Sequence, residues 1–171
     1  MVLTAVGPDR PGLVQELAFV IHDAGANLED SRMAILGGEF ALILLFSGSE
    51  AAVQRVTSAA PAFEARLGLR VALHETKPPA RALSLLGYRL KVSGIDRPGI
   101  VASVSKVIAG RGINVASLES RVKHAPLTGT PMFLLEAEVQ IPAALPLATV
   151  REALTVACEE EALEFSLEPS A

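Results

Sequence analysis

The chain has 171 residues, of which 50% are hydrophobic and 20% are charged, and its formal net charge is −4 at pH 7. This much apolar material excludes an intrinsically disordered chain. An acidic chain lacks the basic surface that binds a phosphate backbone, so we expect no direct contact with nucleic acid. The longest apolar run, residues 40–46, falls well short of the ~20 residues that span a bilayer. Asp9 and Arg10 interrupt the N-terminal apolar stretch, which argues against a signal peptide, and we expect a cytoplasmic protein.

Hydrophobic periodicity predicts the same six elements twice along the chain. Strand, helix, strand, strand, helix and strand are predicted first over residues 1–7, 13–24, 27–36, 39–46, 50–67 and 69–75. They are predicted again over residues 88–94, 100–111, 114–123, 132–141, 146–162 and 163–168. Gly25 and Gly112 follow the first helix of each set, where a left-handed residue is wanted, and Gly37-Gly38 predicts a tight hairpin. We expect Pro61 to kink or split its helix.

An internal repeat explains this periodicity. The heptapeptide Gly-Pro-Asp-Arg-Pro-Gly-Leu at residues 7–13 returns as Gly-Ile-Asp-Arg-Pro-Gly-Ile at residues 94–100, an offset of 87. At this offset ten of the 21 positions from residue 7 to residue 27 are identical, namely Gly7, Asp9, Arg10, Pro11, Gly12, Val14, Val20, Ile21, Gly25 and Asn27. Residues 29–33 resemble residues 118–122 if a two-residue insertion precedes the latter. The chain is therefore a duplicated domain.

The order βαββαβ, found twice, predicts an α+β fold of two ferredoxin-like domains, each an antiparallel sheet with its helices on one face. The domains are predicted over residues 1–76 and 87–171, with a short, stiff, proline-rich linker over residues 77–86. A domain of about 80 residues buries only a modest core. We therefore expect the two domains to pack side by side as one eight-stranded sheet. Because exposed sheet edges tend to be paired, we also expect a homodimer.

The repeated Asp-Arg-Pro-Gly turn is the strongest candidate for a ligand site. Its aspartate stands where a helix N-cap is expected, with the proline in the first helical turn. Its glycine leaves the backbone bare where free N–H groups at a helix start can receive a carboxylate. An asparagine, Asn27 or Asn114, begins the following strand, and we expect the fold to bring its amide close enough to the turn to contact the same ligand. Donors for a carboxylate and a side-chain oxygen for an amine together suit an amino acid.

A purely structural role explains much of the same turn, since a capped strand-to-helix connection also uses aspartate and glycine. Arg10 and Arg97 fit that explanation less well because a cap needs no arginine. Two roles stay open for them, contact with a ligand carboxylate and a salt bridge between the domains.

Catalytic and metal-binding chemistry finds little support in the sequence. His22, His74 and His124 are scattered over a helix, a strand and a loop without metal-ligand spacing. Cys158, the only cysteine, reads as a small buried residue of a helix. No nucleophile elbow, P-loop or dinucleotide fingerprint is present. We expect no catalytic residues, no metal and no cofactor.

The pattern of Asp-x-x-Gly, a hydrophobic helix and Gly-x-Asn, matched in both copies, resembles the ACT domain family over residues 1–76 and 87–168. Two such domains in tandem, with Gly-Thr-Pro at residues 129–131, are similar to the glycine cleavage system transcriptional repressor family. The resemblance implies an amino-acid site at a domain interface. Its lining residues correspond to Asp9, Arg10, Pro11, Gly12, Leu13, Gly25 and Asn27 in the first copy and to Asp96, Arg97, Pro98, Gly99, Ile100, Gly112 and Asn114 in the second. The longer hairpin loop of the second copy leaves equal occupancy of the two sites open.

Three functions follow as hypotheses. The first is a regulator that binds glycine or another small amino acid and acts on transcription through a DNA-binding protein partner. The second is a regulatory subunit of an amino-acid or one-carbon enzyme, and the third is a dimerisation module without a ligand. The sequence leaves the ligand, the partner and the role of residues 124–131 undetermined.

Overall fold

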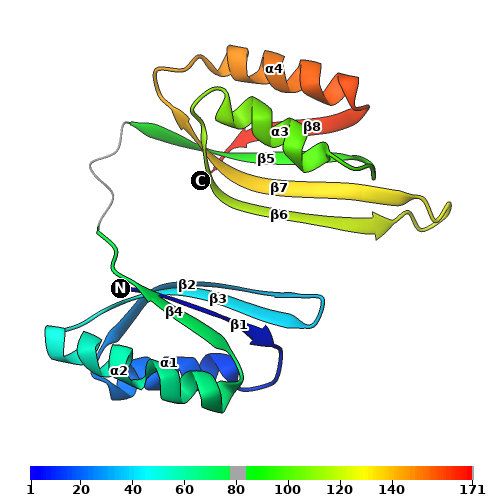
Figure 1. Ribbon diagram of the computed structural model, residues 1–171. Coiled ribbons are helices and arrows are strands. Elements are labelled where there is room, and N and C mark those ends of the chain that lie inside the picture. Colours follow the sequence, from blue (N-terminus) through cyan, green and yellow to red (C-terminus); the bar gives the residue numbers. More distant parts are fainter. Residues whose placement is uncertain (78–83, 171) are drawn as a thin grey trace. The chain divides into compact units, whose positions relative to one another are not determined.

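The computed structural model describes residues 1–77 and 84–170, which form two compact units divided near residue 78 (Figure 1). The first unit consists of β1 (Val2–Pro8), α1 (Leu13–Asp23), β2 (Asn27–Leu36), β3 (Glu39–Ser47), α2 (Glu50–Leu67) and β4 (Arg70–His74). The second consists of β5 (Leu85–Ile95), α3 (Ile100–Ala109), β6 (Asn114–His124), β7 (Pro131–Pro142), α4 (Leu147–Glu160) and β8 (Leu163–Pro169). The predicted βαββαβ order is confirmed in both units.

Each unit has one antiparallel sheet, with strand order β2-β3-β1-β4 in the first and β6-β7-β5-β8 in the second. Both helices of a unit cover the same face of its sheet (Figure 1). The strands form one four-stranded sheet in each unit, and the side-by-side packing of the two domains as one eight-stranded sheet stays a prediction. The predicted stiff linker falls largely on residues 78–83, outside the described residues, and β5 begins three residues earlier than expected.

The two copies stay in register further than the sequence comparison suggested. A register shift interrupts β2 between Leu28 and Asp30 and β6 between Val115 and Ser117. These positions differ by 87, the offset of the repeat, so the two-residue insertion predicted before residues 118–122 is wrong. The extra residues of the second copy lie in the turn between β6 and β7, since residues that pair alike in β3 and β7 differ by 93.

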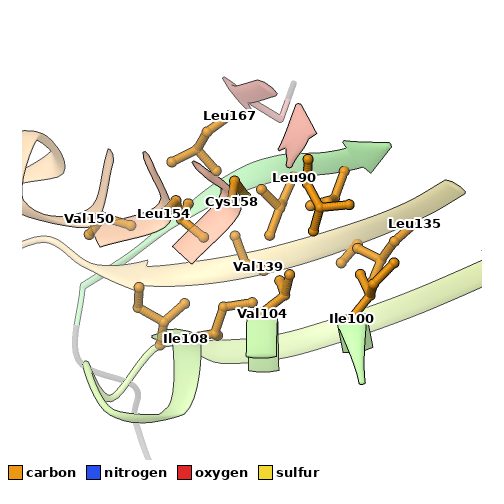
Figure 2. Close-up of a cluster of buried hydrophobic side chains, with 14 of the residues drawn as sticks. Leu90, Ile100, Val104, Ile108, Leu135, Val139, Val150, Leu154, Cys158 and Leu167 are labelled. Atoms are coloured by element: carbon orange, nitrogen blue, oxygen red, sulfur yellow. The ribbon is translucent and has the colours of Figure 1, made fainter. Parts of the chain in front are cut away.

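Each unit has its own hydrophobic core between the helices and the sheet. Along β3, every second residue is buried, beginning with Phe40 and ending with Phe46, as a strand with one covered face requires. Figure 2 shows the core of the second unit, where Val104 of α3, Leu154 of α4 and Val139 of β7 come together. Cys158 belongs to this core at 2% exposure, which confirms the prediction of a buried helical residue, and burial raises the pKa of its thiol.

Two backbone predictions have different outcomes. Gly37 and Gly38 have φ values of 60° and 88°, so the tight hairpin turn between β2 and β3 is confirmed. Of the two effects expected at Pro61, a kink or a split of its helix, the split is wrong, because α2 runs unbroken from Glu50 to Leu67. Ser49 caps α2 by accepting a hydrogen bond from the backbone N–H of Ala52, and burial of one helix face holds the rest together.

Candidate functional site

The same backbone hydrogen bond joins the Asp-Arg-Pro-Gly turn to the hairpin connection in both units. The backbone N–H of Asp9 donates to the carbonyl of Gly38, at 3.0 Å, and that of Asp96 donates to the carbonyl of Pro131, at 2.9 Å. The acceptors lie at the hairpin end of the sheet, after β2 in one unit and after β6 in the other. The turn and the hairpin connection therefore lie together at one end of the strands in each unit, although the two hairpin loops differ in length.

The glycine of the turn, not the aspartate, is the helix N-cap. Gly12 precedes α1 with a φ of 94° and Gly99 precedes α3 with a φ of 101°, and no side chain caps either helix. The expectation that Asp9 and Asp96 are N-caps is therefore wrong, because each lies three residues before the capping position. Their prolines also precede the helix, outside its first turn. Glycine is needed here since other residues rarely adopt such a φ.

The start of each helix presents free backbone N–H groups. In α1 the first helical hydrogen bond runs from the N–H of Glu16 to the carbonyl of Gly12, at 2.9 Å. The equivalent bond in α3 joins Ser103 and Gly99, also at 2.9 Å. A side chain at Gly99 would meet no atom within 4 Å, so the space over this helix start is open. A carboxylate is favoured at such a position by the unpaired N–H groups and the helix dipole.

Each arginine of the turn pairs with a carboxylate of its own unit. Nη1 of Arg10 lies 2.7 Å from Oε1 of Glu16, within α1, and this contact lowers the pKa of the Glu16 carboxyl. Nη2 of Arg97 lies 3.9 Å from Oε2 of Glu161, which directly follows α4. The salt bridge between domains that the sequence left open for these arginines stays a hypothesis. The side chains of Arg10 and Arg97 are each more than two fifths exposed, so they stay accessible to a ligand.

A surface hollow of about 440 Å³ lies beside the turn of the first unit. It is lined by Asp9, Arg10, Gly12, Leu13, Val14, Gln15, Met33 and Phe40. Leu13 and its counterpart Ile100 are core residues, only 1% and 2% exposed, so they support the turn from below. Val14 and Met33 are about half exposed and were missed by the sequence reasoning, although the repeat of Val14 in the second copy was a signal.

The glycine and asparagine of the Gly-x-Asn motif lie at the other end of the unit from the turn. Asn27 pairs with Ser47 at one end of β3, whereas the turn lies beside Glu39 at the other end. A strand of nine residues separates these ends by roughly 30 Å. The expectation that one unit brings its turn and its asparagine together is therefore wrong. Asn114 has the equivalent position, and its amide donates to the side-chain oxygen of Gln140 at 2.8 Å.

Other features of the motif have packing roles. A Cβ on Gly7 would lie 2.8 Å from the carbonyl oxygen of Gly68, and one on Gly94 would lie 2.5 Å from a methyl of Leu163. These glycines let the closing strand approach, which explains their repetition. Gly25 and Gly112 have φ values of 72° and 65°, as predicted. Within residues 1–77 and 84–170, no group of three His, Cys, Asp or Glu side chains is arranged to hold a metal ion.

The fold and the repeated turn define a tandem arrangement of two small regulatory modules. The ACT domain profiles match residues 1–74 and 88–150, and the chain belongs to the ACT domain family. The glycine cleavage system transcriptional repressor of Escherichia coli strain K12 is 30% identical over 94% of this chain and 84% of its own length. The protein of that description from Shigella flexneri matches equally well. A crystal structure of an unknown protein from Galdieria sulphuraria matches with a TM-score of 0.79 and 30% identity, covering 99% of this chain and 97% of that one. Homology to these repressors supports a regulatory role.

Proposed function

We propose that this protein is a non-enzymatic regulator that binds a small amino acid, such as glycine, and controls transcription of glycine cleavage genes through a protein partner in the cytoplasm. The similarity to the repressors extends over 94% of the chain and thus includes both domains. The observation that carries the ligand proposal is the turn itself, which occurs twice with an exposed arginine beside a helix start that no side chain caps.

The groups beside the hollow suit the two charges of an amino acid. The carboxylate would accept hydrogen bonds from the guanidinium of Arg10 and from free N–H groups at the start of α1. The carboxylate of Asp9, which lines the same hollow, would receive the ammonium group. Half-exposed Val14 and Met33 would contact the remainder of the ligand.

The two turns differ in how firmly their arginines are held. A ligand at the first turn must compete with Glu16, whose carboxylate lies 2.7 Å from Arg10. At the second turn Arg97 is 3.9 Å from its acidic partner, and Ser103 replaces the glutamate of α1. A ligand carboxylate at the second turn therefore has a weaker ion pair to displace from the arginine, and we expect the tighter ligand binding there.

An acidic chain needs a partner to act on DNA. With a net charge of −4, the protein lacks the surplus of cations that neutralises phosphates. Ligand binding can regulate such a partner only if the ligand favours one state of the protein over another. A DNA-binding protein that recognises only one of these states would convert amino-acid concentration into gene expression.

Calorimetric titration of the full chain with each of the twenty amino acids tests the ligand proposal. We expect saturable heat with glycine or a similarly small amino acid, and loss of most of it in Arg97→Gln, with a smaller loss in Arg10→Gln. Arg121→Gln, an exposed arginine of β6, is the matched control and should bind normally. No heat with any amino acid would contradict the proposal.

Co-purification tests the partner proposal. Tagged full-length protein from its native host should retain a DNA-binding regulator in a manner that depends on the ligand. Recovery of a metabolic enzyme in its place would favour the regulatory-subunit hypothesis.

A further inference from the structure

The face of the first sheet that α1 and α2 leave uncovered is apolar at its centre. Alternation along the strands sends Leu3, Ala5, Leu42 and Leu44 into the core. The residues between them point the other way, and we call them the open face: Val2, Thr4 and Val6 of β1 with Ala41, Ile43 and Leu45 of β3. Val6 is 47% exposed and Ile43 is 49% exposed. Charged side chains, among them Asp30 and Arg70, lie at the margins of this face.

The second unit shows that the fold itself does not need this apolar face. At the offsets given by strand pairing, the residues that replace Val2, Thr4, Ile43 and Leu45 are Arg89, Lys91, Glu136 and Glu138. Nε of Arg89 and Nζ of Lys91 lie 3.6 Å and 3.8 Å from Oε1 of Glu136. The second sheet thus has a water-compatible, ion-paired face where the first has aliphatic side chains. Since the two units share one fold, their difference points to a surface that is covered in the first unit.

We propose that the open face of the first sheet is an interface between two copies of this protein, packed sheet against sheet. Its centre carries no charge, so two copies can meet there without burying an unpaired ion. The corresponding face of the second sheet is an unsuitable partner, because it would bring Arg89, Lys91 and their acidic partners into an apolar contact. The inference does not depend on ligand binding.

A two-fold axis parallel to the strands gives complementary contacts across this interface. Such an axis places β3 of one copy over β1 of the other and the β2 edge over the β4 edge. Residues at the same strand level then meet: Leu45 lies over Val2, and Ile43 over Thr4. At the margins the acidic Asp30 faces His74, which occupies the same level on the opposite edge. The aligned packing of two twisted sheets suits this arrangement.

The whole uncovered side of the first sheet, which is the open face together with its flanking strands β2 and β4, has an area near the minimum for a specific dimer. Its four strands contain between five and ten residues each. With strands ~4.8 Å apart and a rise of ~3.3 Å per residue, one face measures roughly 500 Å². Two faces would bury about 1,000 Å², near the lower bound for a specific interface.

Light scattering coupled to size exclusion tests the proposal with the full chain. We expect a dimer for the wild type and a monomer for the double variant Ile43→Glu, Leu45→Glu. Glutamate occupies the equivalent positions 136 and 138, so the variant should fold, which circular dichroism and thermal unfolding would verify. The matched control, Glu136→Gln with Glu138→Gln, changes the charge of the other sheet by the same amount and should remain folded and dimeric.

Three outcomes would overturn the inference. A monomeric wild type at micromolar concentrations would mean that another protein, and not a second copy, covers the open face. An undiminished dimer in the folded double variant would place the interface elsewhere, as in pairing between strand edges. Equal loss of the dimer in the control would show that general charge, and not the open face, controls association.

Discussion

Gly12 and Gly99 fix the direction in which the chain enters the first helix of each unit. Their φ values of 94° and 101° are accessible to glycine and costly for any other residue. The aspartates before them are exposed or half-buried and take no part in capping. Their repetition in the two copies therefore needs another cause, and the proposed contact with a ligand ammonium supplies one.

Substitutions at the turn should separate these roles. Gly12→Ala should lower the free energy of unfolding by about 1–3 kcal/mol, because it forces a strained backbone conformation. Asp9→Ala should change it by less than about 0.5 kcal/mol, since no helix cap is lost. Urea denaturation measures both, and Gly99→Ala with Asp96→Ala repeats the comparison in the second unit. Equal destabilisation by the two kinds of variant would restore a capping role for the aspartate.

At the scale of elements, α2 shows that tertiary packing can outweigh a local preference. A proline at position 61 cannot donate a hydrogen bond to the carbonyl four residues earlier and crowds the preceding turn. The helix nevertheless continues on both sides, because Val56, Phe63 and Leu67 are buried against the sheet. Burial of these side chains in the core of the first unit thus offsets the free-energy cost of the proline.

Pro61→Ala should recover part of that cost. We expect an increase of about 1–3 kcal/mol in the free energy of unfolding, since proline in a helix interior is roughly 3 kcal/mol less favourable than alanine. Pro146→Ala is the control, because Pro146 is the N-cap of α4, where its missing N–H matters little. A change no larger in Pro61→Ala than in this control would show that α2 has adapted to its proline.

At the scale of the whole molecule, the duplication has produced two modules with separate cores and different surfaces. Each buried cluster is made of residues from one unit. The first module has an apolar open face, and the second has an ion-paired face and a longer hairpin. Two similar folds can therefore present different surfaces to the surroundings of the protein.

The second module should fold without the first. A fragment of residues 84–171 retains all four strands and both helices of its unit. We expect cooperative urea unfolding with an m-value of at least about 1 kcal/mol/M, as in other small domains. Far-ultraviolet circular dichroism and the fluorescence of Tyr88, in a chain without tryptophan, can follow this unfolding. A broad, non-cooperative transition would show that its core depends on the first module.

The duplication, the βαββαβ order and the family could be predicted from the sequence, because repeated motifs and hydrophobic periodicity are local properties of the chain. It also predicted the left-handed conformation of Gly25 and Gly112, since a helix end favours it locally, but not that of Gly12 and Gly99. The N-cap of each helix and the pairing of Arg10 with Glu16, six residues away, became clear from the local backbone geometry of the structure. The pairing of Arg97 with Glu161 and the distance between the turn and Asn27 came from the tertiary fold. These depend on strand register and on contacts between distant segments, which spacing along the chain does not specify.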